Sequence, residues 1–128
     1  MATSSSTSSP LVGRLVWVTD AAGGSVRVAP AMVPFVHALR LRAFALKARF
    51  VLTSGYRSPA EQAALYDRYL AGDPNVLYPP AKNSYHEYGL AVDVESNKLL
   101  ELGQYAESIG MRWGGRFGDP VHFDLGKR

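Results

Sequence analysis

No cysteine occurs among the 128 residues of the chain. Disulfide bonds, cysteine-rich zinc sites and thiol nucleophiles are therefore excluded, and a metal site could be built only from histidine, aspartate and glutamate. Histidine is scarce as well, since the chain has three. Two of them, His86 and His122, each have a carboxylate a few residues away, and this pairing raises the question of a metal.

The sequence also lacks a hydrophobic run long enough to cross a membrane. Its Ala- and Leu-rich stretch from Ala31 to Phe50 is interrupted by arginine, lysine and histidine, whereas a spanning helix needs about 20 apolar residues. The formal net charge of +3 comes from scattered lysines and arginines, with no aromatic stacking platform beside them. We therefore expect no membrane span, and nucleic-acid binding is kept only as a third class of function.

The composition is that of a globular protein, with 47% hydrophobic and 20% charged residues. A chain of this length is ordinary for one domain. Its first ten residues are almost entirely serine, threonine and alanine, without the basic and apolar segments of a secretory signal. We expect a flexible tail over residues 1–10 and one domain over residues 11–128, made in the cytoplasm without a signal peptide and monomeric.

Hydrophobic periodicity predicts alternating strands and helices in the first half. Two β-branched runs, 14–19 and 25–29, flank the turn-forming residues 20–24 and predict a hairpin. The period then becomes helical over about residues 31–47, and the apolar run 50–53 predicts a buried strand.

The clearest helix start of the chain follows that strand. Ser58 is a good N-cap, Pro59 suits the first helical position, and Glu61 completes a capping box. The predicted helix ends near residues 71–74, where glycine and proline occur. Arg57 is thereby placed at a strand-to-helix junction.

The second half contributes one strongly alternating strand, 89–95, which places Asp93 on the face opposite its apolar neighbours. A helix is predicted over residues 97–109, followed by strands over 111–113 and 121–125. His122 and Asp124 share one face of the last strand. Together these elements predict an α+β fold, a small antiparallel sheet packed by helices.

His86, Asp93 and His122 form the simplest ligand set for a metal ion. A catalytic zinc usually has three protein ligands and one open position, and without cysteine these must be histidine nitrogens and carboxylate oxygens. A turn at residues 87–89 could fold His86 back over the strand that carries Asp93, with Gly89 supplying the flexible backbone.

Several ordered motifs extend this pattern. They are Ser-Gly-Tyr-Arg-Ser from Ser54, Ser-x-His-x-x-Gly-x-Ala-x-Asp from Ser84, Trp-Gly-Gly from Trp113 and Asp-x-x-His-Phe from Asp119. Together they resemble the zinc peptidases of the D-alanyl-D-alanine carboxypeptidase family, which includes VanY-type carboxypeptidases and phage L-alanyl-D-glutamate endopeptidases. The resemblance covers about residues 51–125, well over half of the chain.

The resemblance implies a hedgehog-like or D,D-peptidase-like fold with one zinc ion at the sheet. It assigns the zinc ligands to His86, Asp93 and His122, and the catalytic base to Asp119. A carboxylate beside a zinc-activated water is the chemistry that peptide hydrolysis needs. An aspartate at the base position is more similar to the phage endopeptidase branch.

Arg57 and Ser84 complete the predicted site. Arg57 matches the arginine of its motif, and its guanidinium is suited to a substrate carboxylate or a developing oxyanion. Ser84 is expected to form a hydrogen bond near the metal or the substrate. As residue types alone, a surface or capping arginine and a capping serine are the alternatives.

The expected function is hydrolysis of the peptidoglycan stem peptide in the bacterial cell wall, at the L-alanyl-D-glutamate bond as in phage endolysins. A D-alanyl-D-alanine carboxypeptidase is the alternative within the same class. A non-catalytic wall-binding module that keeps zinc for stability is the alternative from another class. Asp119 argues against such a module, which would not need a base.

Overall fold

The fold contains two antiparallel sheets. The computed structural model describes residues 13–76 and 84–126, and the predicted tail over residues 1–10 lies outside this range. The smaller sheet pairs β2 (Val16–Thr19) with β3 (Ser25–Val28), which confirms the predicted hairpin. The larger sheet has the order β4-β5-β7-β6. Its strands are β4 (Val51–Ser54), β5 (Ala91–Glu95), β7 (His122–Asp124) and β6 (Arg112–Trp113).

The helices confirm the predicted α+β class. They are α1 (Val33–Ala45), which continues from the 3-10 turn η1 (Pro30–Met32), α2 (Pro59–Leu70) and α3 (Leu99–Ser108), with two further 3-10 turns, η2 (Tyr85–Tyr88) and η3 (Gly114–Phe117). Each α-helix lies within a few residues of its predicted place, and η1 falls at the start of the helix predicted over about residues 31–47. None of the helices in the described ranges has the length and apolar content that crossing a bilayer requires.

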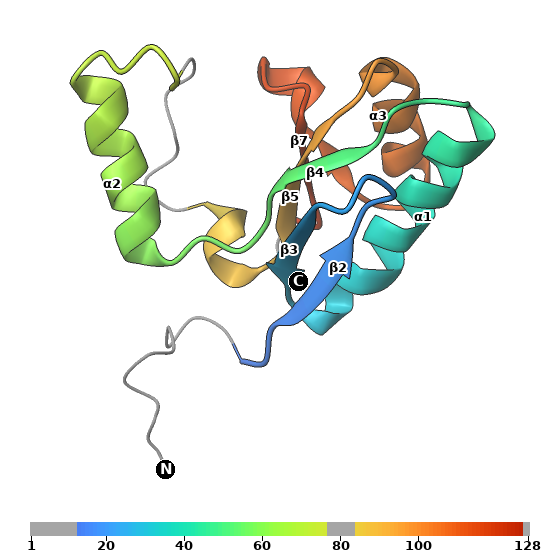
Figure 1. The fold of residues 1–128 in the computed structure, drawn as a ribbon, viewed down its shortest axis with the longest axis horizontal. Helices are drawn as coiled ribbons and strands as arrows, with labels where there is room; N and C mark the ends of the chain where they lie inside the picture. The colour runs from blue at the N-terminus through green and yellow to red at the C-terminus, as the bar shows by residue number, and fades with distance from the viewer. Residues whose placement is uncertain (1–12, 77–83, 127–128) are drawn as a thin grey trace.

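The core lies between the larger sheet and the pair of helices α1 and α3, which lie side by side at the right of Figure 1. Burying each Val, Leu or Phe side chain stabilises the fold by about 1.5–3 kcal/mol. The helices and the strands both contribute side chains to this core that are at most 2% exposed: Val36, Leu39, Ala43, Val92, Val94, Leu102, Ala106 and Phe123.

The turn of the N-terminal hairpin is bonded to the larger sheet through Asp20. Its Oδ1 accepts hydrogen bonds of 2.8 Å from the backbone N–H groups of Ala22 and Gly24. Its Oδ2 accepts a third bond, also of 2.8 Å, from the N–H of Leu52 in β4. The two sheets are therefore joined by one buried carboxylate.

Helix α2 lies on the other side of the molecule from α1 and α3 (Figure 1). The predicted capping box is confirmed, because the Ser58 side chain accepts from the Glu61 N–H and the Glu61 side chain accepts from the Ser58 N–H. Gln62 is the buried residue of this helix. Most of α2 is thus available to border a surface feature instead of the core.

Candidate metal centre

His86, Asp93 and His122 converge at one end of the larger sheet. One ligand atom from each lies within 4.8 Å of the others, a group that could hold a metal ion. The Asp93 Oδ1 atom is 3.2 Å from His86 Nε2 and 3.5 Å from His122 Nδ1. The structure therefore brings together all three residues that the sequence predicted as ligands.

Strand register explains how ligands so distant in sequence meet. β5 and β7 are antiparallel neighbours, and their pairing places Asp93 directly opposite His122. Paired residues project on the same face of a sheet, so their side chains come together. A register shift between β4 and β5 at residues 52–54 places Ser54 opposite Asp93 as well.

The short turn η2 supplies His86. Its capping box joins Ser84 and Glu87, since Ser84 Oγ accepts from the His86 N–H at 3.2 Å and Ser84 N donates to Glu87 Oε2 at 2.7 Å. The turn ends at Gly89, whose φ of 72° lies in the left-handed region that favours glycine. The contacts of Ser84 are thus those of a helix cap that positions His86, and its predicted contact with substrate remains a prediction.

Outer hydrogen bonds orient both imidazole rings. The Nδ1 atom of His86 lies 2.8 Å from the carbonyl oxygen of Gly55, and the Nε2 atom of His122 lies 2.7 Å from Oδ2 of Asp124. A carbonyl or carboxylate oxygen only accepts, so each of these nitrogens carries the proton. When the rings are neutral, the opposite nitrogens, which face Asp93, present lone pairs to a metal, as in the carboxylate–histidine arrangement of many zinc sites.

The Oδ1 atom of Asp93 supports a metal at this place. It is buried and accepts no hydrogen bond within the described part of the chain. A buried carboxylate oxygen without a partner is costly, and a cation between the carboxylate and the two imidazole lone pairs would satisfy it. Two nitrogens and one oxygen are donors that zinc accepts in catalytic sites. The residues present therefore fit a zinc ion.

The electrostatics of the group favour charge on Asp93. Burial alone would raise the pKa of Asp93, but contacts with His122 and His86 hold it below its ordinary value. Burial would likewise lower the pKa of His122, but the carboxylates of Asp124 and Asp93 raise it to about 9. A metal ion that takes this position must displace a proton from His122.

Asp119 lies on the segment that leads into β7. Its N–H donates to the carbonyl of Gly114 at 2.8 Å, and its own carbonyl accepts from the His122 N–H at 3.0 Å. Burial is the main reason that the pKa of its carboxyl is raised, and the negative charge of Asp93 adds to it, against the opposing charges of His122, His86 and Arg57. A half-buried carboxyl with a raised pKa beside a candidate metal site suits a proton acceptor.

Arg57 lies beside the carboxylate of Asp93, and its predicted contact with substrate remains a prediction. Its terminal nitrogens bond to Gln62 Oε1 and Ser54 Oγ, each at 2.8 Å, and one lies 3.3 Å from Oδ2 of Asp93. Its backbone N–H donates to the carbonyl of His86 at 3.0 Å. Arg57 therefore holds the outer oxygen of Asp93 while Oδ1 faces the histidines.

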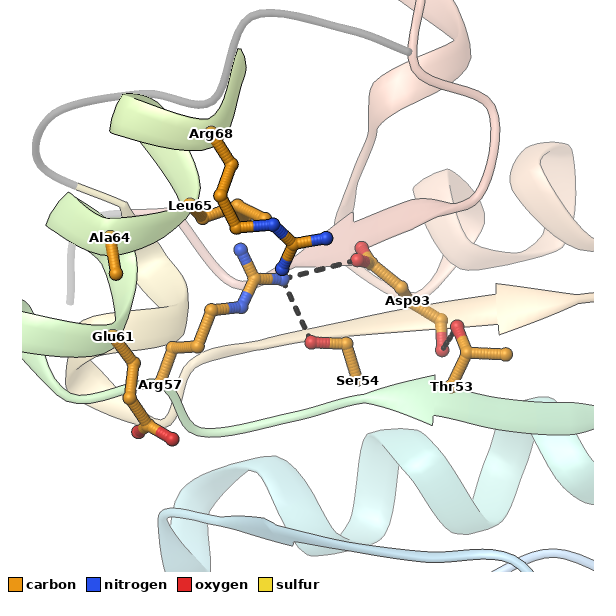
Figure 2. A pocket seen from close by; sticks show the side chains of 8 residues that line it. All are labelled: Thr53, Ser54, Arg57, Glu61, Ala64, Leu65, Arg68 and Asp93. Carbon is orange, nitrogen blue, oxygen red and sulfur yellow. Dashed lines mark hydrogen bonds and ion pairs between the residues drawn. The ribbon is translucent and has the colours of Figure 1, made fainter. Parts of the chain in front are cut away.

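A cavity of about 540 Å³ opens beside Asp93, between α2 and the end of β4. Figure 2 shows Arg57 and Arg68 reaching toward each other from opposite sides, with Asp93 beside their guanidinium groups. Arg68 was not predicted as a site residue, although its helical spacing from Glu61 places both on one face of α2. The lining residues are Thr53, Ser54, Arg57, Glu61, Ala64, Leu65, Arg68 and Asp93.

Comparisons with known proteins agree with this geometry. No family model matches the chain. The peptidoglycan L-alanyl-D-glutamate endopeptidase CwlK of Bacillus subtilis is 31% identical over an alignment of 99 residues that covers 59% of each chain. The chain thus spans less than two thirds of the length of this relative.

Solved structures share the fold. The VanY D,D-pentapeptidase of the VanB-type resistance cassette, in complex with Zn(II), has a TM-score of 0.60 and 18% identity, covering 88% of this chain and 80% of that one. The D,D-dipeptidase VanXYg has a TM-score of 0.65 and 24% identity, covering 88% and 55%. The L-Ala D-Glu endopeptidase ChiX of Serratia marcescens has a TM-score of 0.55 and 23% identity, covering 77% and 80%. The chain thus has the fold of the VanY-type peptidases, and its predicted resemblance to that zinc-peptidase family is confirmed.

Proposed function

We propose that the chain is a zinc-dependent peptidase that cleaves the L-alanyl-D-glutamate bond of the peptidoglycan stem peptide. The observation that carries the proposal is the orientation of the ligand atoms. Nε2 of His86 and Nδ1 of His122 face Oδ1 of Asp93, which accepts no hydrogen bond from the residues that the structure describes, while Gly55 and Asp124 hold the opposite ring nitrogens. The similarity to CwlK, which is named for this bond, supports the choice of substrate.

The proposed mechanism gives each residue one task. His86, Asp93 and His122 would hold the ion, which when bound polarises the scissile carbonyl and activates water near neutral pH. Asp119 accepts the proton of the attacking water and returns it to the leaving amine. The raised pKa of Asp119 helps it to hold that proton between the two steps.

Arg57 would stabilise charge on the substrate. Its contacts with Ser54, Gln62 and Asp93 fix the plane of the guanidinium, so the group does not need to be reoriented when substrate arrives. Its remaining N–H groups border the cavity (Figure 2). We assign them to a carboxylate or to the oxyanion that develops during attack.

A D-alanyl-D-alanine carboxypeptidase is the second candidate. The fold similarity to VanY-type enzymes favours it, including a structure of VanYB in complex with D-alanine-D-alanine. The two candidates differ in the bond that they cut. The endopeptidase cuts between the first and second residues of the stem, and the carboxypeptidase releases the last alanine. The monomeric state, the synthesis in the cytoplasm and the action on the cell wall remain predictions.

Digestion of a purified pentapeptide stem, followed by mass spectrometry, tests the proposal. We expect free L-alanine, or a muramyl-alanine fragment, together with a peptide that begins with D-glutamate. Release of D-alanine alone would establish the carboxypeptidase instead. Intact peptide in the presence of zinc would favour the non-catalytic module.

A further inference from the structure

Helix α2 presents one face to the cavity. Glu61, Ala64, Leu65 and Arg68 all line it, and they recur at the three- and four-residue spacing that places side chains on one side of a helix. Because Gln62 is the residue of α2 that is buried, packing in the core does not account for this face. The face borders the candidate metal centre, since Asp93 lines the same cavity.

Arg68 is held in position at the end of that face. Its Nε donates to Oδ2 of Asp73 at 2.9 Å, and Oδ1 of Asp73 accepts from the N–H of Asn75 at 2.8 Å. The carboxylate of Asp73 is therefore fixed, and it orients the guanidinium plane of Arg68. Figure 2 shows this guanidinium directed toward that of Arg57 and toward Asp93.

The two guanidinium groups can still donate to an anionic ligand. Asp73 pairs with Arg68 through Nε and Asp93 pairs with Arg57 through one terminal nitrogen, so N–H groups of both arginines remain to bind an anion in the cavity. Glu61 does not supply that anion, because its Oε1 accepts from the Ser58 N–H at 2.8 Å and its carboxylate points away from the arginines in Figure 2. Asp93 is engaged by Arg57 through Oδ2 and faces the histidines through Oδ1.

A carboxylate is the anion that fits this site. Planar guanidinium groups bind carboxylates through paired N–H donors, and the apolar side chains of Ala64 and Leu65 line the same cavity. A glutamyl residue that continues the peptide through one carboxyl group keeps the other as a free carboxylate. In a substrate cleaved before that residue, the free carboxylate lies close to the reacting bond.

We propose that Arg68, with Arg57, forms a subsite for the free carboxylate of the glutamyl residue that follows the scissile bond. The proposal rests on the function proposed above and adds its source of specificity. Arg68 is a specificity residue and not a catalytic one, because it is assigned to the free carboxylate of the substrate and not to the reacting bond. It should act mainly on KM.

Two peptides that differ in one group test the subsite. One carries the glutamyl residue with its free carboxylate and the other with a carboxamide in its place. We expect the parent protein to prefer the acid by about tenfold or more in kcat/KM, as a charge-assisted hydrogen bond implies. Arg68→Gln should remove the preference by lowering kcat/KM on the acid, mostly through KM.

Arg49→Gln is the matched control. Arg49 is likewise exposed and ion-paired, with its Nε 3.9 Å from Glu95, and it does not line the cavity. This variant should keep the preference for the acid. An Arg68→Gln variant that still prefers the acid, or a parent that cleaves both peptides equally, overturns the proposal. An effect of Arg68→Gln confined to release of a C-terminal D-alanine overturns the glutamyl assignment as well.

Calorimetric binding of the product peptide that begins with the glutamyl residue separates the subsite from the reaction. The zinc-loaded parent should bind the acid form about tenfold or more tightly than the amide, and Arg68→Gln should bind both alike. If this pattern holds while neither substrate is cleaved, the subsite stands and the proposed reaction fails. If the expected bond is cleaved without any dependence on Arg68, the reaction stands and the subsite fails.

Discussion

Asp119 owes its place to a tight backbone contact with its neighbours. A Cβ atom on Gly114 would collide with the carbonyl oxygen of Asp119, so the Trp-Gly-Gly motif leaves room for the segment that carries this carboxylate. The same carbonyl accepts from the N–H of His122. Asp119, the proposed base, and His122, a proposed ligand three residues later, are thus held together by a backbone hydrogen bond.

Replacing Asp119 by asparagine tests its role as the base. The amide is similar in size but cannot accept the proton, so kcat should fall by about a hundredfold or more. Zinc content and the midpoint of thermal unfolding should stay at the parent values. Asp67→Asn, on the exposed surface of α2, is the control and should remain fully active. Parent-like activity of Asp119→Asn would remove this residue from the mechanism.

Asp124 acts on the metal site through His122. It is completely buried, and its Oδ2 lies 2.7 Å from His122 Nε2. We expect Asp124→Asn to weaken zinc affinity by about 10- to 100-fold, as loss of an outer carboxylate partner does in other zinc sites. Competition with a chelator of known affinity measures the change.

Arg112→Gln provides the comparison for this prediction. It removes the outer ion pair, in which Arg112 Nε lies 3.3 Å from Asp124 Oδ1, and the contacts of the guanidinium with the rings of Tyr85 and Phe117, but it leaves the carboxylate in place. Its effect on zinc affinity should be smaller than that of Asp124→Asn. Equal affinity of Asp124→Asn and the parent would show that the carboxylate does not support the ligand.

At the scale of elements, Asp20 joins the hairpin to the larger sheet. Burial alone would raise the pKa of Asp20, but hydrogen bonds from the backbone N–H groups of Leu52, Gly24 and Ala22 hold it below its ordinary value. A depressed pKa means that the ionised carboxylate stabilises the fold above the unfolded pKa, about 4. That contribution is lost as the pH falls through the folded pKa.

Asp20→Asn should therefore destabilise the fold in a pH-dependent way. Its amide nitrogen cannot accept from the Leu52 N–H, and a buried donor without a partner costs about 1–3 kcal/mol. Urea unfolding of the zinc-free proteins should show this difference at pH 7 and a smaller one at pH 3. The same difference at both pH values would contradict the role assigned to the ionised form.

Some elements could be predicted from local patterns and others could not. The alternation in β5 correctly placed Asp93 opposite its apolar neighbours, and the capping box at Ser58 correctly placed the start of α2. The residues of a second capping box, Ser84 and Glu87, are also present in the sequence. The 3-10 turn that they begin is too short to produce a helical hydrophobic period. The fold class and the three candidate ligands therefore followed from the sequence.

The partners of the ligands depend on packing that local patterns do not contain. The carbonyl of Gly55 reaches His86 because Gly55 lies against β3, where a Cβ atom would collide with Val26. Trp113 packs against Gly103 of α3 in the same way, since a Cβ atom there would collide with the indole ring. Such contacts join residues far apart in sequence, and only the assembled fold shows them.

At the scale of the whole molecule, the candidate metal centre connects separate parts of the chain. Its ligands come from η2, β5 and β7, and its outer partners come from the end of β4 and from β7. An ion that binds the folded arrangement and not the unfolded chain stabilises the fold. The site and the stability of the domain are therefore linked.

Zinc content tests the central claim most directly. Equilibrium dialysis against zinc, followed by elemental analysis, should give one zinc per chain for the parent and for His37→Ala, which changes the histidine of α1 outside the group. His122→Ala should lose nearly all of its zinc at the same free concentration. A parent that binds no zinc, or a His122→Ala variant that keeps one zinc per chain, would contradict the account.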